Sequence, residues 1–253
     1  MELGLAGRRA VVTGASKGIG LAVAQVLAAE GCDVHLVARS AGDLRTVCEA
    51  IGANARGSIS FDAFDLSDSR NVDRLCESQS GLDILVNNAG AIPAGTLADV
   101  DEQRWREAWD LKVFGYINMC RRVYADMQGR GGVIINVIGI GGEKPMPGYA
   151  AGAGGNAALM ATTRALGSTS GADGIRVVGI NPGLIETERL VTMQRTFAQA
   201  KLGDAERWQE MLDPVFPPGK PEHIADMVAF LASDRSSNTS GTVITIDGGA
   251  SAR

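Results

Sequence analysis

The fold is decided by the stretch Arg9-Ala10-Val11-Val12-Thr13-Gly14-Ala15-Ser16-Lys17-Gly18-Ile19-Gly20. Its first five residues predict a short buried strand, and the residues from Ile19 onward have the periodicity of a helix. Gly14 allows a tight turn, Gly18 lets the backbone approach a pyrophosphate, and Gly20 lets the helix pack closely on the strand. The free N–H groups at the helix start favour phosphate. We therefore predict a dinucleotide-binding site here, formed by Gly14, Ser16, Lys17, Gly18, Ile19 and Gly20.

Outward from this stretch, short runs rich in Val and Ile alternate with helical patterns, as is typical of strands covered on both faces. The predicted strands are Arg9–Thr13, Asp33–Ala38, Ser58–Phe64, Ile84–Asn87, Val133–Ile138, Arg176–Ile180 and Thr242–Ile246. The predicted helices are Ile19–Glu30, Asp43–Gly52, Ser69–Gln79, Glu102–Met127, Asn156–Gly167 and Pro221–Ser233. We expect Ser67 or Asp68 to cap the third helix, and Pro221 to open the last. This order predicts an α/β fold, a Rossmann-type doubly wound parallel sheet of about seven strands with helices on both faces.

Length, charge and cysteine spacing narrow the class of protein. At 253 residues we expect a single domain over residues 1–253, and the net charge of −5 gives no reason to expect nucleic acid or a membrane as a partner. The sequence has no long apolar run and no signal-peptide core, so a cytoplasmic location is expected. The cysteines lack metal-site spacing, so we expect free thiols and no metal; they are Cys32, Cys48, Cys76 and Cys120.

The segment Thr187–Lys220 interrupts the alternation, and we name it the lid segment. It is long for a connection inside a compact domain, and it carries apolar residues up to Pro217-Pro218. Connections of this length are commonly lids or binding loops, so a helical substrate lid at about 187–220 is expected. The alternative is a helical excursion that packs its apolar residues on the body.

The end of the second predicted strand indicates which dinucleotide binds. An acid there would bond a ribose 2′-hydroxyl, whereas a cation accommodates a 2′-phosphate. The strand ends in Ala38-Arg39-Ser40 without an acid, and Lys17 adds a second cation on the same side. Arg39 offers a planar fork and Ser40 a hydroxyl. We predict NADP(H) in preference to NAD(H); the alternative is that Arg39 is a solvated surface residue.

The order of these motifs resembles the short-chain dehydrogenase/reductase family along essentially the whole chain. The spacing of the three glycines is similar to that of the family. So are Asp65-Leu66, Asn87-Asn88-Ala89-Gly90, Pro182-Gly183-Leu184-Ile185-Glu186-Thr187 and the late Ser240-Gly241 and Asp247-Gly248-Gly249. The resemblance implies a homodimer or homotetramer and further cofactor contacts. These contacts are Asp65, Leu66, Asn88, Ala89, Gly90, Pro182, Gly183 and Thr187.

The resemblance also implies a catalytic Ser, Tyr and Lys with a helical Asn, and the chain departs from this set. Aligned without gaps, Gly139, Gly152 and Asn156 occupy the Ser, Tyr and Lys positions, and Lys112 occupies the Asn position. The amine and the amide are thus exchanged between two helices. We hypothesise that Lys112 supplies the cation from the opposite helix. The alternative is a Lys112 that extends to solvent beside a degenerate site.

Tyr149 is the candidate proton donor. It lies about one helical turn before Gly152, and the glycines from Gly148 to Gly155 would let the segment carry its phenol into the cavity. A shifted alignment would instead put Tyr149 on the Tyr position, with Ala153 on the Lys and Asn136 on the Ser. A third possibility is that Tyr149 only lines the cleft. The candidate catalytic residues are Lys112, Tyr149 and Asn156.

The function that follows is that of an NADP(H)-dependent oxidoreductase with a non-standard proton-transfer site. Its small-molecule substrate is a carbonyl compound or alcohol, and the apolar residues of the lid segment favour an apolar or aromatic one. One alternative is a catalytically silent NADP(H)-binding protein, and another is a dehydration or isomerisation in the same pocket. Glu143 and Lys144 are either substrate contacts or a solvated loop, whereas His35 is expected to be structural and His223 to lie at the surface.

Overall fold

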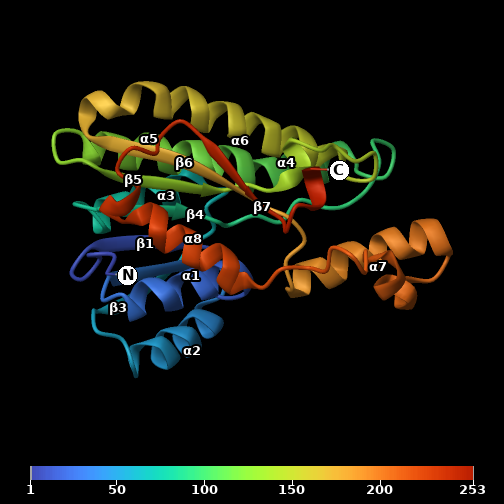
Figure 1. Cartoon of the computed structure of the whole chain (residues 1–253), viewed down its shortest axis with the longest axis horizontal. Helices are drawn as coiled ribbons and strands as arrows, with labels where there is room; N and C mark the ends of the chain where they lie inside the picture. The colour runs from blue at the N-terminus through green and yellow to red at the C-terminus, as the bar shows by residue number, and fades with distance from the viewer. Residues whose placement is uncertain (1, 253) are drawn as a thin grey trace.

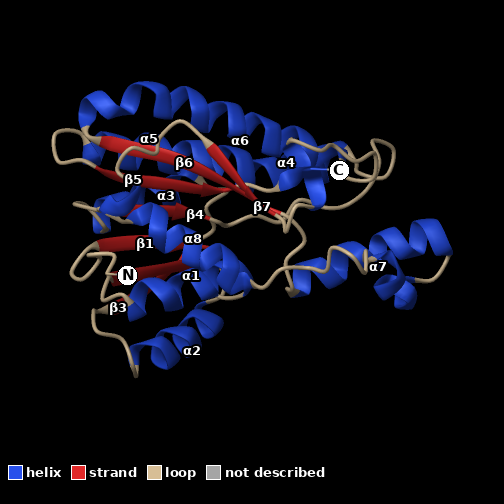
Figure 2. Ribbon diagram, in the orientation of Figure 1, coloured by secondary structure: helices blue, strands red, loops and turns tan. Residues whose placement is uncertain are grey.

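The computed structural model describes residues 2–252, and its centre is a seven-stranded parallel sheet (Figure 2). The strands are β1 (Arg9–Thr13), β2 (Asp33–Ala38), β3 (Ile59–Ala63), β4 (Ile84–Asn87), β5 (Gly132–Val137), β6 (Ile175–Pro182) and β7 (Val243–Ile246). Their order in the sheet is β3-β2-β1-β4-β5-β6-β7, and every neighbouring pair is parallel. The predicted doubly wound sheet is confirmed.

Helices cover both faces of this sheet (Figure 1). They are α1 (Gly18–Ala29), α2 (Ala41–Gly52), α3 (Ser69–Ser78), α4 (Glu102–Trp109), α5 (Gly115–Met127), α6 (Ala150–Thr169), α7 (Glu188–Leu202) and α8 (Pro221–Ala232). One buried cluster joins the sheet to α1, α2 and α8, and another joins it to α3 and α5. The two clusters therefore hold opposite layers of helices on one sheet.

Local signals set several helix starts. Asp68 caps α3 by accepting a hydrogen bond from the backbone N–H of Arg70 at 2.9 Å. Ser40 caps α2 in the same way, accepting from Asp43 at 3.2 Å. Pro221 is at the start of α8, where its missing N–H is not needed. The predicted Asp68 cap and the Pro221 start are confirmed.

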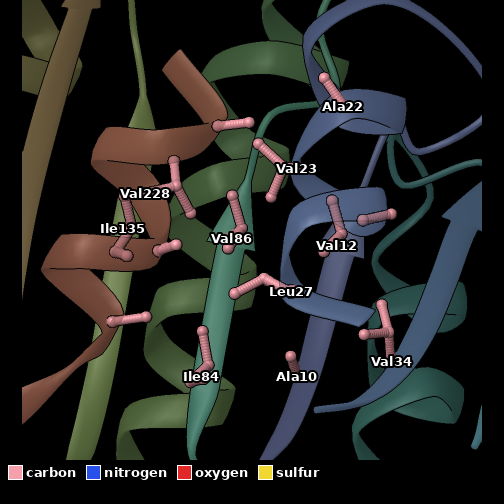
Figure 3. Packing of buried hydrophobic residues seen from close by; sticks show 14 of the residues in the cluster. Ala10, Val12, Ala22, Val23, Leu27, Val34, Ile84, Val86, Ile135 and Val228 are labelled. Atoms are coloured by element: carbon pink, nitrogen blue, oxygen red, sulfur yellow. The ribbon is translucent and has the colours of Figure 1, made fainter. Parts of the chain in front are cut away.

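The larger core cluster fixes the height of α1 above the sheet. Val12 on β1 and Val86 on β4 face Val23 and Leu27 of α1, with Val228 of α8 beside them (Figure 3). All five side chains are fully buried. Burial of one such side chain stabilises the fold by about 1.5–3 kcal/mol. Because β1 and α1 are held rigidly, the loop that joins them has a defined shape.

Two helices differ from the sequence prediction. The helix predicted over Glu102–Met127 forms, but a π-helical turn over Asp110–Phe114 interrupts it. Helix α6 begins at Ala150 rather than at Asn156. Its glycines weaken helix propensity, but tertiary contacts compensate: Trp109 Nε1 donates to the Ala151 carbonyl at 3.0 Å.

The lid segment forms two helical pieces, α7 and a 3₁₀ segment over Ala205–Met211, which project from the body (Figure 1). They pack mainly on each other. One side of α7 returns to the body, where Leu190 is buried and the Phe197 ring lies 3.1 Å from the Cβ position of Gly148. The helical form is as expected, and the role as a lid stays a prediction.

Within residues 2–252, no helix has both the length and the apolar character needed to span a bilayer. Over the same residues, no cluster of three or more His, Cys, Asp or Glu side chains is arranged to hold a metal ion. Cys32, Cys48, Cys76 and Cys120 are free thiols, and two of them are buried.

Candidate active site

A pocket of about 180 Å³ opens at the carboxyl ends of β4, β5 and β6. This end of a doubly wound sheet is where ligands bind in such folds. The polar side chains that line it are Asn88, Lys112, Tyr149, Asn156, Thr187 and Arg189. Its apolar wall includes Met146, Leu184, Ile185, Leu190 and Met193. We name this cavity the active-site pocket.

The loop between β1 and α1 has the geometry of a phosphate cradle. Gly14 has a φ of +66°, and a Cβ there would lie 2.9 Å from the Cα of Ala89. A Cβ on Gly20 would lie 2.2 Å from the carbonyl oxygen of Gly14, so both positions need glycine. No side chain caps the start of α1, and its first turn has no acid. The helix start therefore fits the phosphates of a dinucleotide.

The motif after β4 is tied to the end of β1. Thr13 Oγ1 accepts hydrogen bonds from the backbone N–H groups of Asn88 and Ala89, at 2.9 and 3.0 Å. The Asn88 amide donates back to the carbonyl of Thr13 at 3.0 Å. A Cβ on Gly90 would lie 2.4 Å from Cδ of Lys112, so the missing side chain makes room for the lysine.

The motif after β6 reaches over the same loop. Gly183 donates to the Ile246 carbonyl at 2.9 Å. Thr187 caps α7 by accepting from Leu190 at 3.3 Å. A Cβ on Gly18 would lie 3.2 Å from the Thr187 methyl group. The active-site pocket is thus lined by several predicted cofactor contacts, namely Ile19, Asn88, Gly90, Pro182, Gly183 and Thr187.

A second cavity, of about 420 Å³, has Arg39 and Asp65 in its wall. Arg39 is exposed directly after β2, and the hydroxyl of Ser40 accepts the cap bond of α2. Asp65 accepts hydrogen bonds from the N–H and hydroxyl of Ser67, at 3.0 and 2.8 Å. Leu66 is buried. An exposed guanidinium at this wall fits an adenosine that carries a 2′-phosphate.

Lys17 has a partner that the sequence did not indicate. Its ammonium lies 2.7 Å from a carboxylate oxygen of Glu188, in an exposed ion pair between the glycine loop and α7. A contribution of Lys17 to phosphate binding therefore stays a prediction.

The π-helical turn presents Lys112 to the end of β5. Its ammonium donates to the carbonyls of Ile138 at 2.8 Å and Val137 at 3.3 Å. Protein atoms surround the ammonium, although the side chain keeps some exposure toward the pocket. Burial, and then the positive charge of Arg189, lower the pKa of Lys112 from 10.5 to about 7. Lys112 therefore points into the pocket region and does not extend to bulk solvent.

Tyr149 occupies the space that a side chain at position 152 would need. A Cβ on Gly152 would lie 2.0 Å from Cζ and 2.1 Å from Cε1 of the Tyr149 ring. A Cβ on Gly141 would lie 3.1 Å from the same ring. Tyr149 is 8% exposed and lines the active-site pocket. The glycines thus admit the phenol to the cavity, as the sequence suggested.

Arg189 is a site residue that sequence reasoning missed. It lies in the first turn of α7, and one of its amino groups donates to the phenol oxygen of Tyr149 at 2.9 Å and to the Ile92 carbonyl at 3.0 Å. The sequence signal that could have identified it is its position two residues after Thr187, which ends the motif that follows β6. A guanidinium beside a phenol oxygen interacts favourably with negative charge that develops there.

Asn156 reaches the end of β5 from α6, which packs against the π-helical turn that carries Lys112. Its amide nitrogen donates to the Gly139 carbonyl at 3.2 Å, while its buried Oδ1 has no hydrogen-bond partner among the described residues. Gly139 has a φ of +133°, in the region that favours glycine, and a Cβ there would lie 3.0 Å from the Asn156 amide nitrogen. Amine and amide therefore contact consecutive carbonyls from two different helices.

The remaining polar candidates lie outside this arrangement. Glu143 accepts hydrogen bonds from Asn181 at 3.3 Å and Thr245 at 3.0 Å, so it ties its loop to β6 and β7. His35 is buried between β2 and β3, where its ring nitrogen bonds Ser60 at 2.8 Å. His223 bonds the backbone N–H of Lys220 at the start of α8.

Comparisons with known proteins agree with this geometry. Residues 14–251 match the model of the family described as enoyl-(acyl carrier protein) reductase. A 3-oxoacyl-[acyl-carrier-protein] reductase of Chlamydia trachomatis is 29% identical over 250 residues, which cover 97% of this chain and 98% of that protein. A trans-4-hydroxycyclohexanecarboxylate dehydrogenase of Sinomonas cyclohexanicum is 31% identical, with 96% and 92% covered.

Solved structures of reductases and dehydrogenases are similar to this chain along nearly its whole length. L-Sorbose reductase of Gluconobacter frateurii, in complex with NADPH and L-sorbose, superposes with a TM-score of 0.88 at 31% identity and covers 98% of both chains. A 7α-hydroxysteroid dehydrogenase in complex with NADH has a TM-score of 0.85 at 28% identity, covering 98% of this chain and 96% of that one. Sequence match, topology and the arrangement of the motifs lead to one assignment: the chain belongs to the short-chain dehydrogenase/reductase family.

Proposed function

We propose that this protein is an NADP(H)-dependent oxidoreductase that interconverts a carbonyl compound and its alcohol, with Tyr149 as the proton donor. One observation carries the proposal: the Tyr149 ring fills the space above Gly152, the position aligned with the family tyrosine, and lines the pocket. A different residue thus brings a phenol next to the position that carries the family tyrosine.

The cofactor residues fit this reaction. The uncapped start of α1 would hold the phosphates, Arg39 the 2′-phosphate, and Pro182, Gly183 and Thr187 the nicotinamide end. When bound, NADPH supplies a hydride to the carbonyl carbon, and one proton must then reach the carbonyl oxygen. The preference for NADP(H) over NAD(H) rests on Arg39, since family members of known structure bind either cofactor.

The pocket residues transfer the proton and stabilise the charges that develop during the reaction. Tyr149 gives its proton to the carbonyl oxygen during reduction, and Arg189 stabilises the charge left on the phenol oxygen. Lys112 supplies positive charge from the π-helical turn, and Asn156 holds the Gly139 loop from α6. This exchange of amine and amide takes the place of the family's Ser-Tyr-Lys triad. Without the serine hydroxyl, the ammonium of Lys112 is the donor best placed to stabilise an oxyanion.

The substrate class follows from the pocket and from the relatives. The relatives include a trans-4-hydroxycyclohexanecarboxylate dehydrogenase and an L-sorbose reductase, which supports carbonyl and alcohol chemistry here. The pocket wall of Met146, Leu190 and Met193 supports a substrate with an apolar part. We propose that the lid segment closes over it.

The test begins with NADPH binding, followed by a panel of ketones, aldehydes and alcohols read at the nicotinamide absorbance. Tyr149→Phe should lower kcat about 100- to 10,000-fold while NADPH affinity is unchanged, because it removes only the proton donor. Tyr124→Phe is the matched control, since that phenol bonds Asp173 far from the pocket.

Three outcomes would contradict the proposal. Full activity in Tyr149→Phe would remove the phenol from the mechanism. NADPH binding with no turnover would favour a catalytically silent binding protein. Conversion of a substrate with no net change in nicotinamide absorbance would favour a dehydration or isomerisation.

A further inference from the structure

The active-site pocket is unbalanced in charge. Two cationic side chains, Lys112 and Arg189, line it, and no Asp or Glu belongs to its lining in the part of the chain that the structure describes. Protein atoms enclose the ammonium of Lys112, where an unpaired charge is costly, whereas Arg189 is exposed and its charge stays in contact with water. A pocket with two cations and no acid is therefore suited to a ligand that brings negative charge.

Arg189 has hydrogen-bonding capacity left for such a ligand. A guanidinium has five N–H donors, and the bonds to Ile92 and Tyr149 both come from a single amino group. Across residues 2–252, no carboxylate forms an ion pair with Arg189. A planar fork with free donors matches the geometry of a carboxylate.

Lys112 lacks an anionic partner as well. Its hydrogen-bond acceptors are two backbone carbonyls, and the aromatic ring of Tyr116 lies 5.3 Å from its ammonium on the same helix. The groups facing it from other elements are Arg189 of α7, Tyr149 before α6, and the neutral Asn156 of α6. Because Arg189 repels a charge on Lys112, both residues gain when an anion binds near them.

We infer that the substrate of this pocket carries a carboxylate, which Arg189 and Lys112 hold while its carbonyl or hydroxyl group faces Tyr149. The substrate is then an oxo acid or hydroxy acid whose apolar part packs on Met146, Leu190 and Met193. Its chemical class rests on the proposed function, whereas the carboxylate site itself rests on the charges of the pocket. A neutral ketone would bring no negative charge to either cation.

Binding without turnover tests the carboxylate site alone. With the protein saturated in NADP⁺, benzoate should bind about 10- to 100-fold more tightly than methyl benzoate by calorimetry, as expected for a charge-assisted pair. Arg189→Gln should remove this preference by weakening benzoate only. Arg195→Gln, an exposed arginine of the same helix that pairs with Glu206, is the matched control and should keep it. Equal binding of acid and ester would overturn the inference.

Proton uptake gives a second readout. Since the pKa of Lys112 is about 7, the amine is largely neutral at pH 8, and a bound carboxylate should draw a proton onto it. Benzoate binding at pH 8 should then take up a proton, seen as a dependence of the heat on buffer ionisation. Lys112→Met should abolish the uptake. Binding of benzoate to the unaltered protein without uptake would exclude Lys112 from the site.

Turnover separates this inference from the proposed function. Benzoylformate should have a lower KM than its methyl ester, and Arg189→Gln should raise the KM of the acid far more than that of the ester. If Arg189 only positions Tyr149, kcat should instead fall equally for both compounds, which counts against the carboxylate site. If no compound of the carbonyl and alcohol panel reacts but the benzoate preference persists, the proposed function fails and the carboxylate site stands.

Discussion

At the scale of single residues, the site depends on two positions where a side chain is missing. Gly139 has a left-handed backbone that a serine would adopt only under strain, and Gly152 lies against the Tyr149 ring. Neither glycine is a simple gap from which a side chain was lost. Each allows a neighbouring group, Asn156 or Tyr149, to lie where it does.

Gly152→Ala tests whether activity depends on the position of the Tyr149 ring rather than on the stability of α6. The new methyl group would lie 2.0 Å from the phenol ring, so the ring must move, and kcat should fall at least about 100-fold because proton transfer needs close geometry. Gly154→Ala is the matched control in the same helix, where a Cβ makes an ordinary 3.4 Å contact with Trp109. It should keep activity and raise stability by about 0.5–1 kcal/mol. Wild-type kcat in Gly152→Ala would contradict a catalytic Tyr149.

The sequence predicted several residues of this site and missed others. The prediction that Lys112, Tyr149 and Asn156 approach one cavity agrees with the structure, and their catalytic roles stay predictions. Arg189 was not predicted as a site residue because it lies in the lid segment, where no motif or periodicity marks it. The ion pair of Lys17 with Glu188 was not predicted because it joins residues far apart in the chain.

At the scale of elements, the π-helical turn decides where Lys112 lies. A π turn adds a residue to one helical turn and is frequent at functional sites. Here it spans Asp110–Phe114 and turns the lysine toward the carbonyls at the end of β5. The helical periodicity of Glu102–Met127 predicted one helix, and it could not reveal the extra residue.

Stability should depend on pH through Lys112. The unfolded lysine keeps its proton up to about pH 10.5, whereas the folded one loses it above about 7, so the unfolded state binds more protons between these values. The free energy of unfolding should therefore rise between pH 7 and 8, by about 1 kcal/mol. Urea unfolding at pH 7, 8 and 9 measures this, and Lys112→Met should lack the rise.

Between about pH 8 and 9 the sign changes, because the thiols of the unfolded chain begin to lose their protons there. Burial raises the pKa of Cys32 and Cys120 to about 12 and that of Cys76 to about 11 from 9.0, so there the folded state holds the extra protons. Stability should then fall with pH in both proteins. A wild-type curve parallel to that of Lys112→Met from pH 7 to 9 would contradict a lowered pKa at Lys112.

The strands were predicted closely because local sequence defines them, whereas the start of α6 was predicted wrongly because tertiary contacts define it. Strands β1 and β4 are built on short apolar runs with clear ends, so local sequence defines them. The first residues of α6 are rich in glycine, and their helix is held by contacts with Trp109 and Val113 of another helix. Such contacts are invisible to local propensity.

At the scale of the whole molecule, the dinucleotide would join elements from distant parts of the chain. The glycine loop, the motifs after β4 and β6 and the second cavity at Arg39 lie along the carboxyl edge of the sheet. A ligand bound across all of them stabilises the folded state as a unit. We expect a homodimer or homotetramer from the family resemblance, which sedimentation would establish.

Cofactor preference should appear in thermal unfolding. NADPH at about 100 times its Kd stabilises by about 2.7 kcal/mol, which raises Tm by roughly 5–10 °C in a chain of this size. At equal concentration NADH should raise it less. Arg39→Ala should reduce the NADPH shift toward that of NADH and leave the NADH shift unchanged, while Arg195→Ala should alter neither. A larger shift with NADH in the unaltered protein would contradict the assignment to NADP(H).

The contact between Tyr149 and Gly152 also limits how this protein can evolve. A tyrosine side chain introduced at position 152 would compete with Tyr149 for the same volume, and loss of Tyr149 first would leave the pocket without its phenol. Single substitutions in either order therefore pass through a defective intermediate. Passage to an arrangement with the phenol at position 152 requires positions 149 and 152 to change together, so mutant libraries that vary one site at a time will miss this arrangement.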